Sequence, residues 1–418
     1  MRVTGIVAEF NPLHHGHQYL IDYARNIMHS DYVIIVMSGD FTQRGIPAVC
    51  SKYDRTSMAL SCGADLVLEI PAIMSTSSAQ LFAGSAVTLL HKTGIVTDII
   101  FGAENDDMDS FEKLSTLLLH ESNSLKENLN LELNSGISYP KALSRAIYQE
   151  TKDDALTAFI NNPNNILGIE YIKTLKMLDS NIKAHCVLRK DCLHSDSMLH
   201  SQVFASSMAL RNELVHNSYE NIHPFVPEVT FQLVKKLAIT NSYIDYDDIS
   251  VLLHDRLYSK DSFEDILDCT PDLSHRILKK RDEFVSASSF INTIASKNLT
   301  QARISRVLCH ILLQYTYDDL SAFRECDLAP YLKVLGFRKE ALPLFHLLKE
   351  KSFLPIITSP ARLPENFNQK QQQYLQLDLR AFEIYRILSI KKTGCIQPTE
   401  YTRKFEIFSS NDEINEVQ

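Results

Sequence analysis

The sequence predicts an α/β fold in which a parallel sheet, covered by helices on both faces, is followed by a mostly α-helical region. In the first half of the chain, short apolar runs rich in β-branched residues alternate with segments of helical spacing. The runs are apolar at nearly every position, which is typical of parallel strands buried on both faces. Beyond about residue 220, strand-like runs nearly vanish until the tail, and helical spacing takes over.

Five apolar runs are expected to form the strands of the sheet. They are residues 3–8, 32–37, 65–70, 98–101 and 182–188. The helical patterns between them are residues 17–28, 53–62, 79–90 and 166–178. Because parallel strands need crossover connections, this alternation favours a sheet whose helices pack on both faces.

The second half is expected to be helical, and Pro224 and Pro227 mark the junction. The expected helices are residues 233–238, 249–258, 263–267, 273–286, 301–315 and 342–350. The Gln-rich segment 365–378 is interpreted as an exposed loop or a helix start, and the last ten residues as a solvated tail. We therefore predict two domains, residues 1–220 and residues 221–418.

Composition excludes several classes of protein. Hydrophobic residues make up 45% and charged residues 22%, which is ordinary for a globular chain and excludes a disordered or fibrous one. The net charge of −9 argues against a protein coated in positive charge. None of the 8 cysteines forms a CxxC pair, and no stretch approaches the ~20 apolar residues of a membrane helix. We expect a cytoplasmic protein that does not associate with membranes.

The strongest local signal is GIVAEFNPLHHGH at residues 5–17, where the first strand runs into a loop that opens a helix. The amide groups at a helix N-terminus favour phosphate, and Gly16 lets the backbone approach it. His14 and His17 could both donate hydrogen bonds to phosphorus oxygens. The alternatives are that these histidines are polar loop residues or part of a metal site. Their position after the first strand of a parallel sheet favours the phosphate interpretation.

A second signal is FASSMALRNEL at residues 204–214. Ser206 and Ser207 could cap a helix, with Arg211 one turn inside as a phosphate ligand. Taken alone, the pattern is explained better by a plain N-cap with a surface Arg. Taken with the histidine motif, the two elements could face each other across a nucleotide.

These two motifs together resemble the nucleotidylyltransferase superfamily, with Met208 at the position where its second motif usually has Thr. The resemblance implies a Rossmann-like parallel sheet. Further ordered blocks resemble the bacterial tRNA(Met) cytidine acetate ligase family. They are MSGDFTQRGIPAV at 37–49, KYDRTSMALSCGADLVLEIP at 52–71, AQLFAGSAVTLL at 79–90, IFGAE at 100–104, PNNILGIEY at 163–171 and SKNLTQARISRVLCHILL at 296–313.

The resemblance implies an enzyme that activates acetate with ATP as acetyl-adenylate and releases pyrophosphate. The acetyl group then passes to N4 of the wobble cytidine of elongator tRNA(Met). Mg²⁺ would be carried on the ATP phosphates, without a dense carboxylate cluster. Two rival interpretations are a small-molecule adenylyl- or cytidylyltransferase and a non-catalytic tRNA-binding protein. The long helical half counts against the first, and the intact histidine motif against the second.

The resemblance also implies site residues. His14 and His17 would be catalytic. The ATP site would comprise Val7, Ala8, Glu9, Phe10, Asn11, Pro12, Leu13, His14, His15, Gly16, His17, Gln18, Tyr19, Leu20, Gly102, Asn164 or Asn165, Arg189, Ser207 and Arg211. Lys190 is a rival for Arg189, because the Gly/Ala-rich stretch usual after that Arg is here RKDCLHSDS.

The residues themselves suggest further roles. Gly102 ends a strand where a side chain would collide with a bound base or ribose, and one of Asn164 and Asn165 is expected to cap a helix. Gln43 and Arg44 follow the second strand and could hold acetate or phosphate, or form a surface salt bridge. Lys52 and Arg55 sit at a helix start, where the helix dipole disfavours cations, which raises a phosphate or tRNA role as an alternative. Asp65 and Glu69 are interpreted as structural.

The tRNA would need a positive surface. Residues 276–306 hold seven Lys or Arg against two acidic residues, although the whole chain is acidic. Lys297, Arg303 and Arg306 are the expected phosphate contacts, and Arg303 and Arg306 lie three apart on one helix face. The alternative is an ordinary solvated helix face.

Overall fold

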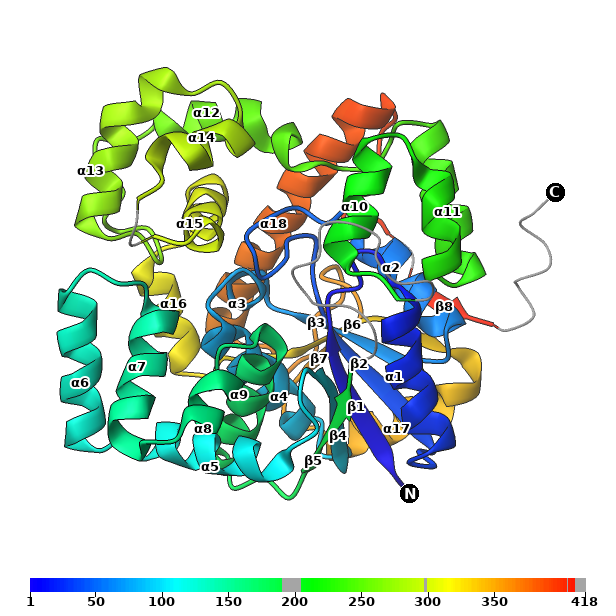
Figure 1. The fold of residues 1–418 in the computed structure, drawn as a ribbon. Helices are drawn as coiled ribbons and strands as arrows, with labels where there is room; N and C mark the ends of the chain where they lie inside the picture. Colours follow the sequence, from blue (N-terminus) through cyan, green and yellow to red (C-terminus); the bar gives the residue numbers. More distant parts are fainter. Residues whose placement is uncertain (190–203, 297–298, 404, 410–418) are drawn as a thin grey trace.

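The computed structural model describes residues 1–189, 204–296, 299–403 and 405–409. It contains one 8-stranded sheet in the order β5-β4-β1-β2-β3-β6-β7, with β8 paired to β6. Helices pack on both faces of this sheet (Figure 1). The strands are β1 Val3–Ala8, β2 Tyr32–Ser38, β3 Leu66–Ile70, β4 Asp98–Ala103, β5 Lys183–Leu188, β6 Leu332–Arg338, β7 Ile356–Ile357 and β8 Glu406–Phe408.

The five strands expected in the first half are all present, and all run parallel. Strand β1 lies between β2 and β4, and its whole length from Val3 to Ala8 pairs with β2. Because β1, β2, β4 and β5 share one direction, their carboxyl ends meet at a single edge of the sheet. Ligands of open α/β sheets bind at such an edge.

Alternate side chains of the strands enter two hydrophobic cores, one on each face of the sheet. In β2, Ile34 and Val36 join one core, whereas Val33, Ile35 and Met37 join the other. This double burial explains why the strand sequences are apolar at nearly every position. The helices of the first half are α1 His15–Asn26, α2 Lys52–Ser61, α3 Ala72–Ser75, α4 Ala79–Lys92, α5 Met108–Leu119, α6 Asn123–Asn134, α7 Tyr139–Thr151, α8 Asp154–Phe159 and α9 Pro163–Met177.

The second half is mostly helical, as expected. Its helices are α10 Ser207–Val215, α11 Glu228–Ile239, α12 Ser250–Leu257, α13 Pro271–Lys280, α14 Ala287–Ile294, α15 Gln301–Leu313, α16 Tyr317–Arg324, α17 Leu342–Lys351 and α18 Gln369–Thr393. Short 3-10 turns lie at Tyr219–Phe225, Tyr246–Ile249, Arg281–Glu283 and Lys339–Ala341. The Gln-rich segment is a helix start, since Asn368 caps α18. Within the described ranges, no helix combines the length and apolar character needed to cross a bilayer.

The helix expected at residues 263–267 is not formed. Phe263 and Ile266 are buried, but tertiary contacts hold this segment in turns: the Leu267 amide donates to the Tyr315 carbonyl at 2.9 Å. Five residues make little more than one helical turn, so such contacts outweigh the helical pattern.

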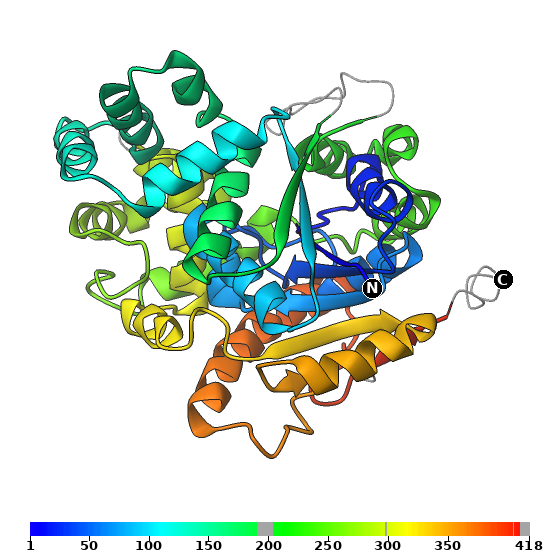
Figure 2. The ribbon, with the colours of Figure 1, turned by 90° about the horizontal axis from the view of Figure 1, so that it is seen from below.

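The expectation that strands nearly vanish before the tail is wrong at β6. This strand pairs antiparallel with β3, from Leu66 opposite Phe337 to Glu69 opposite Lys333. Strands β7 and β8 then pair with β6 in parallel. Figure 2 shows β6 and α17 at this edge of the sheet, where the rings of Phe337 and Phe345 stack. The sheet is therefore mixed but mostly parallel, and the second half completes it. The domain division at about residue 220 stays a prediction.

A buried cluster of charges joins β3, β6 and the segment after α18. The ammonium group of Lys52 contacts the carboxylates of Glu69, at 2.9 Å, and Glu400. The ammonium group of Lys333 contacts the same two carboxylates, at 2.9 and 3.2 Å. Lys52 is 0% exposed, so its charge pairs with buried carboxylates rather than with solvent or a surface ligand. The two cations and two anions neutralise each other away from water, as buried charges must.

The phosphate or tRNA role considered for Lys52 and Arg55 is therefore contradicted. Arg55 is also 0% exposed, and its guanidinium donates to the main-chain carbonyls of Glu9, at 2.7 Å, and of Ser38 and Gly39. Local acceptors, rather than a ligand, account for these cations at the start of α2. Arg55 holds together the carboxyl ends of β1 and β2.

We expect Glu400→Gln to lower the free energy of unfolding by about 3–5 kcal/mol, because one buried cation loses its partner. Denaturant unfolding measures this change. The control is Glu383→Gln, whose carboxylate pairs with Arg386 near the surface of α18, the helix that precedes Glu400. The control should change stability by less than about 1 kcal/mol. An E400Q protein as stable as its E383Q counterpart would contradict the role of the cluster.

The same cluster predicts a pH dependence of stability. Burial alone raises the pKa of Glu400, but Lys333 and Lys52 outweigh it and hold the pKa well below the ordinary 4.5. The folded pKa is thus lower than the unfolded one. The stabilisation should be fully present above about pH 4.5 and disappear as the pH falls through the folded value. Unfolding curves of wild type and E400Q should converge in acid.

Candidate active site

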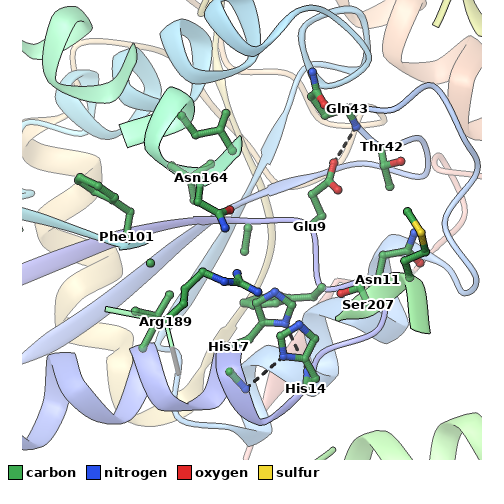
Figure 3. A pocket seen from close by; sticks show the side chains of 18 of the residues that line it. Glu9, Asn11, His14, His17, Thr42, Gln43, Phe101, Asn164, Arg189 and Ser207 are labelled. Atoms are coloured by element: carbon green, nitrogen blue, oxygen red, sulfur yellow. Dashed lines mark hydrogen bonds between the residues drawn. The ribbon is translucent and has the colours of Figure 1, made fainter. Parts of the chain in front are cut away.

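A cavity lies at the edge of the sheet where β1, β4 and β5 end (Figure 3). Most of the predicted ATP-site residues line it: Val7, Ala8, Glu9, Phe10, Asn11, His14, Gly16, His17, Tyr19, Leu20, Gly102, Asn164, Arg189, Ser207 and Arg211. Five predicted residues are outside its lining: Pro12, Leu13, His15, Gln18 and Asn165. The cavity therefore brings together the histidine motif at residues 5–17 and the second motif at residues 204–214.

The histidine motif builds its own helix start. His14 is the N-cap of α1, and its Nδ1 accepts a hydrogen bond from the Gly16 amide at 3.1 Å. In return, the Nδ1 of His17 accepts from the His14 amide at 3.3 Å. This is a capping box made by two imidazoles. Because each Nδ1 accepts a hydrogen bond from a backbone N–H, the ring proton of each neutral imidazole must be on Nε2.

The two rings stack, with their centroids 3.7 Å apart and their planes 22° apart. Phe10 meets the ring of His17 edge-on, with the centroids 5.0 Å apart. Gly16 is needed for this arrangement, since a Cβ there would lie 3.0 Å from the ring of His14. The glycine thus makes room for the ring of His14. The outcome is a pair of fixed imidazoles at the positive end of α1.

Glu9 follows β1 directly and places a carboxylate in the cavity. Its Oε1 accepts a hydrogen bond from the backbone amide of Gln43 at 2.7 Å. Burial raises the pKa of Glu9, although the Gln43 amide and the charges of Arg211, Arg55 and Arg44 pull the pKa back down. The motif analysis gave Glu9 no role beyond its place in the segment. Its contact with Gln43 depends on the adjacency of β1 and β2, which residue spacing alone does not reveal.

The second motif reaches the first one, as expected. Ser206 caps α10 by accepting from the Ala209 amide at 3.1 Å. Arg211 lies one turn inside and donates to the Asn11 carbonyl at 2.8 Å. Burial lowers the pKa of Arg211 to about 10, with the charge of Glu9 acting in the opposite direction. Met208, which replaces the usual Thr, lines the same cavity.

Neither Asn164 nor Asn165 forms the helix cap that was predicted. The N-cap of α9 is Asn162, because Pro163 takes the first helical position, so neither Asn164 nor Asn165 is a cap. The side-chain amide of Asn164 donates to the Glu104 carboxylate at 2.8 Å, and Asn164 lines the cavity. Asn165 is fully buried, and its side-chain oxygen accepts from the Glu104 amide at 3.1 Å. Asn165 therefore positions the loop after β4.

Gly102 and Arg189 form the opposite wall, at the ends of β4 and β5. The Arg189 amide donates to the Ala103 carbonyl at 2.8 Å, and a Cβ at Gly102 would lie 3.3 Å from the Arg189 side chain. Glycine at 102 thus lets Arg189 pack across β4 toward His17 (Figure 3). Lys190, the rival for this role, lies outside the described residues, as does Lys297.

Several lining residues were not singled out by the motifs. Gln43 and Arg44 had been considered for acetate or phosphate, and both line the cavity. The other lining residues are mostly apolar: Thr42, Ile46, Phe82, Phe101, Leu167, Tyr171, Val187, Leu188, Phe204 and Met208. Such residues are indistinguishable from core residues by sequence. They give the cavity an apolar wall of the kind that small-molecule sites usually have.

The loop that carries Gln43 and Arg44 contacts α15. Gly45 adopts φ +71°, and a Cβ there would lie 2.5 Å from Cα of Arg306. Ser305 donates to the Gly45 carbonyl at 3.3 Å. Arg306 and Arg303 share the carboxylate of Asp268, at 2.8 and 3.6 Å. Of the three predicted tRNA contacts, Arg306 therefore lies next to the cavity loop, and both Arg303 and Arg306 are paired with an acidic residue.

Comparison with known proteins agrees with this geometry. Residues 1–397 match the family model described as HIGH Nucleotidyl Transferase. The tRNA(Met) cytidine acetate ligase of Clostridium perfringens is 33% identical over 397 residues, covering 93% of this chain and 96% of the relative. That of Caldanaerobacter subterraneus subsp. tengcongensis is 32% identical over 388 residues, covering 93% and 95%.

Two solved structures of Thermotoga maritima TmcAL have the same fold. The apo form has a TM-score of 0.91 at 27% identity and covers 98% of this chain and 100% of its own. The form bound to alpha-thio ATP has a TM-score of 0.86 at 28% identity, covering 95% and 97%. Family model, relatives and structures all span nearly the whole chain. This chain belongs to the HIGH nucleotidyl transferase family and, within it, to the family of the tRNA(Met) cytidine acetate ligases.

Proposed function

We propose that this chain is a cytoplasmic, ATP-dependent tRNA(Met) cytidine acetate ligase. The observation that carries the proposal is the stacked imidazole pair of His14 and His17, fixed at the N-terminus of α1 inside the cavity. That arrangement suits an ATP α-phosphate, and the relatives named above are ligases of this kind. One solved relative holds an ATP analogue.

In the first step, an acetate oxygen attacks the α-phosphorus of ATP in line with the departing pyrophosphate. Negative charge grows on the phosphorus oxygens as the bonds change. His14 and His17 present Nε2–H donors, since each Nδ1 is engaged by a backbone amide. Catalysis is then positioning and charge stabilisation, without a protein nucleophile.

The cavity walls suggest where the parts of ATP bind. The adenosine would lie between Phe101, Gly102, Asn164 and Arg189, where β4 and β5 end. The pyrophosphate would face Ser207 and Arg211 at the start of α10, which combines helix amides with a buried cation. Mg²⁺ carried on the phosphates would neutralise part of their charge.

In the second step, the acetyl group passes to N4 of the wobble cytidine of elongator tRNA(Met), and AMP leaves. The cytosine base must enter the cavity from the side on which the tRNA binds. The loop of Gln43 and Arg44 borders the cavity and packs on α15, so α15 suits a tRNA-facing element. Arg303 and Arg306 on this helix would contact phosphates, with Asp268 holding their side chains in place.

The proposed function is tested by incubating the protein with ATP, labelled acetate and total tRNA, followed by nucleoside analysis. Label should appear in N4-acetylcytidine at the wobble position of elongator tRNA(Met). Label on a small metabolite alone would favour the small-molecule nucleotidylyltransferase. Acetate-independent tRNA binding without any acetylation would favour a non-catalytic tRNA-binding protein.

His14→Ala and His17→Ala should each slow acetate-dependent ATP–pyrophosphate exchange by about 100-fold or more. One lost donor to a developing phosphorus-centred charge typically costs about 3 kcal/mol. The matched control is His15→Ala, because His15 lies between the two but does not line the cavity. The control should keep most of the exchange rate. Near-normal exchange by both test variants would remove the imidazole pair from the mechanism.

Arg303→Gln/Arg306→Gln should weaken tRNA binding while leaving ATP–pyrophosphate exchange nearly unchanged. Gln keeps part of each side-chain stem, so the packing beside Gly45 is preserved. Each lost phosphate contact should flatten the log–log salt dependence of tRNA affinity by about 0.7–0.9. The control is Lys349→Gln/Lys351→Gln on α17, which packs at the β6 edge of the sheet. Unchanged affinity and slope in the α15 variant would mean that tRNA binds elsewhere.

A further inference from the structure

Acetyl transfer to a cytidine amine releases a proton, and the mechanism above provides no acceptor for it. The N4 lone pair is delocalised into the ring, so the amine attacks a carbonyl well only if its proton is removed as the bond forms. His14 and His17 are unsuited, because each ring already uses its accepting nitrogen for a backbone amide. A base must therefore be sought elsewhere in the cavity lining.

Glu9 is a carboxylate in the right part of this cavity. Figure 3 shows its side chain between the stacked imidazoles and the loop of Thr42 and Gln43. The adenosine wall and the pyrophosphate wall are assigned to β4–β5 and to α10. The remaining side, formed by Glu9 and the Thr42–Gln43 loop, is left for the acetyl group and the incoming base.

The hydrogen bonds of Glu9 leave one oxygen for a substrate. Oε1 accepts from the Gln43 amide, which fixes the orientation of the carboxylate. Across the described ranges, Oε2 takes no hydrogen bond from protein, and no Lys, Arg or His nitrogen lies within 4.0 Å of the carboxylate. A carboxylate held at one oxygen and open at the other has the geometry of a proton acceptor.

We propose that Glu9 is the general base of the acetyl-transfer step. This inference rests on the proposed function. The N4 nitrogen forms its bond to the acetyl carbon while Oε2 of Glu9 takes the N4 proton. The tetrahedral intermediate then collapses, the bond from the acetyl carbon to the phosphate oxygen breaks, and its electron pair leaves with AMP. The proton afterwards passes from Glu9 to solvent.

The surroundings of Glu9 suit this task. Burial raises its pKa. The hydrogen bond from the backbone amide of Gln43 opposes this shift most, and the charges of the nearby arginines oppose it less. A carboxylate whose pKa is raised is a stronger base than an ordinary Glu carboxylate. The charged and titratable groups that face it from the neighbouring elements are Arg44, Arg55, Arg211, Tyr171, His14 and His17. The three arginines oppose the effect of burial and favour the ionised form of the carboxylate.

The test compares Glu9→Gln with wild type in two assays, acetate-dependent ATP–pyrophosphate exchange and single-turnover transfer from acetyl-adenylate to tRNA. Gln keeps an oxygen for the Gln43 amide, so the loop contact survives, and melting temperatures check the fold. Transfer should slow about 100-fold or more, and exchange by less than about tenfold. Wild-type transfer should rise with pH through a pKa above the ordinary 4.5 of Glu, and E9Q should lose that rise.

Two further variants sharpen the comparison. Glu9→Asp keeps a carboxylate one methylene shorter, so its transfer should be intermediate and should retain the rise with pH. Asp22→Asn is the matched control: burial also raises the pKa of Asp22 on α1, but Asp22 does not line the cavity. The control should match wild type in both assays.

The contrary outcomes are distinct. Equal slowing of exchange and transfer by E9Q would make Glu9 an ATP or acetate ligand and overturn its role as base. Normal transfer by E9Q, or an unchanged pH profile, would overturn it as well. If wild-type protein itself passes no acetyl group from acetyl-adenylate to tRNA, the proposed function fails, and the role of Glu9 fails with it.

Discussion

The common direction of β1, β2, β4 and β5 is the constraint on which the rest of the molecule depends. Because these strands are parallel, the loops that follow them leave the sheet at one edge. The histidine motif, the Gln43 loop, Gly102 and Arg189 are far apart in sequence, yet they line one cavity for this reason. Helix α10 forms a further wall of the cavity, and Arg211 on this helix donates a hydrogen bond to the Asn11 carbonyl.

The site is supported from beneath by buried groups that do not line the cavity. Arg55 binds the carbonyls at the ends of β1 and β2, so it fixes the loops that carry Glu9 and the cavity edge. Next to it, Lys52 and Lys333 share the carboxylates of Glu69 and Glu400. Through Glu400, the end of the chain helps to hold the sheet on which the N-terminal motif is built.

The sequence was sufficient to predict those structural features that depend only on residues close together in the chain. The five parallel strands and the start of α1 were predictable, because apolar runs and the His-x-Gly-His spacing are local signals. Strand β6 was missed, since it lies among helical patterns and pairs with a distant strand. The placement of Lys52 and Arg55 in the interior was missed because their partners come from other elements. Asn162 rather than Asn164 or Asn165 caps α9, although Pro163 already marked that position.

The central claim is that acetate attacks the α-phosphorus of ATP at the imidazole pair and that the acetyl group then leaves AMP for a tRNA amine. A reaction with acetate labelled with oxygen-18 at both oxygens tests it most directly. Because the attacking oxygen stays on phosphorus when the acetyl group departs, mass spectrometry should find one labelled oxygen in AMP and none in pyrophosphate. Labelled inorganic phosphate or pyrophosphate, with unlabelled AMP, would place the attack at another phosphorus and contradict the account.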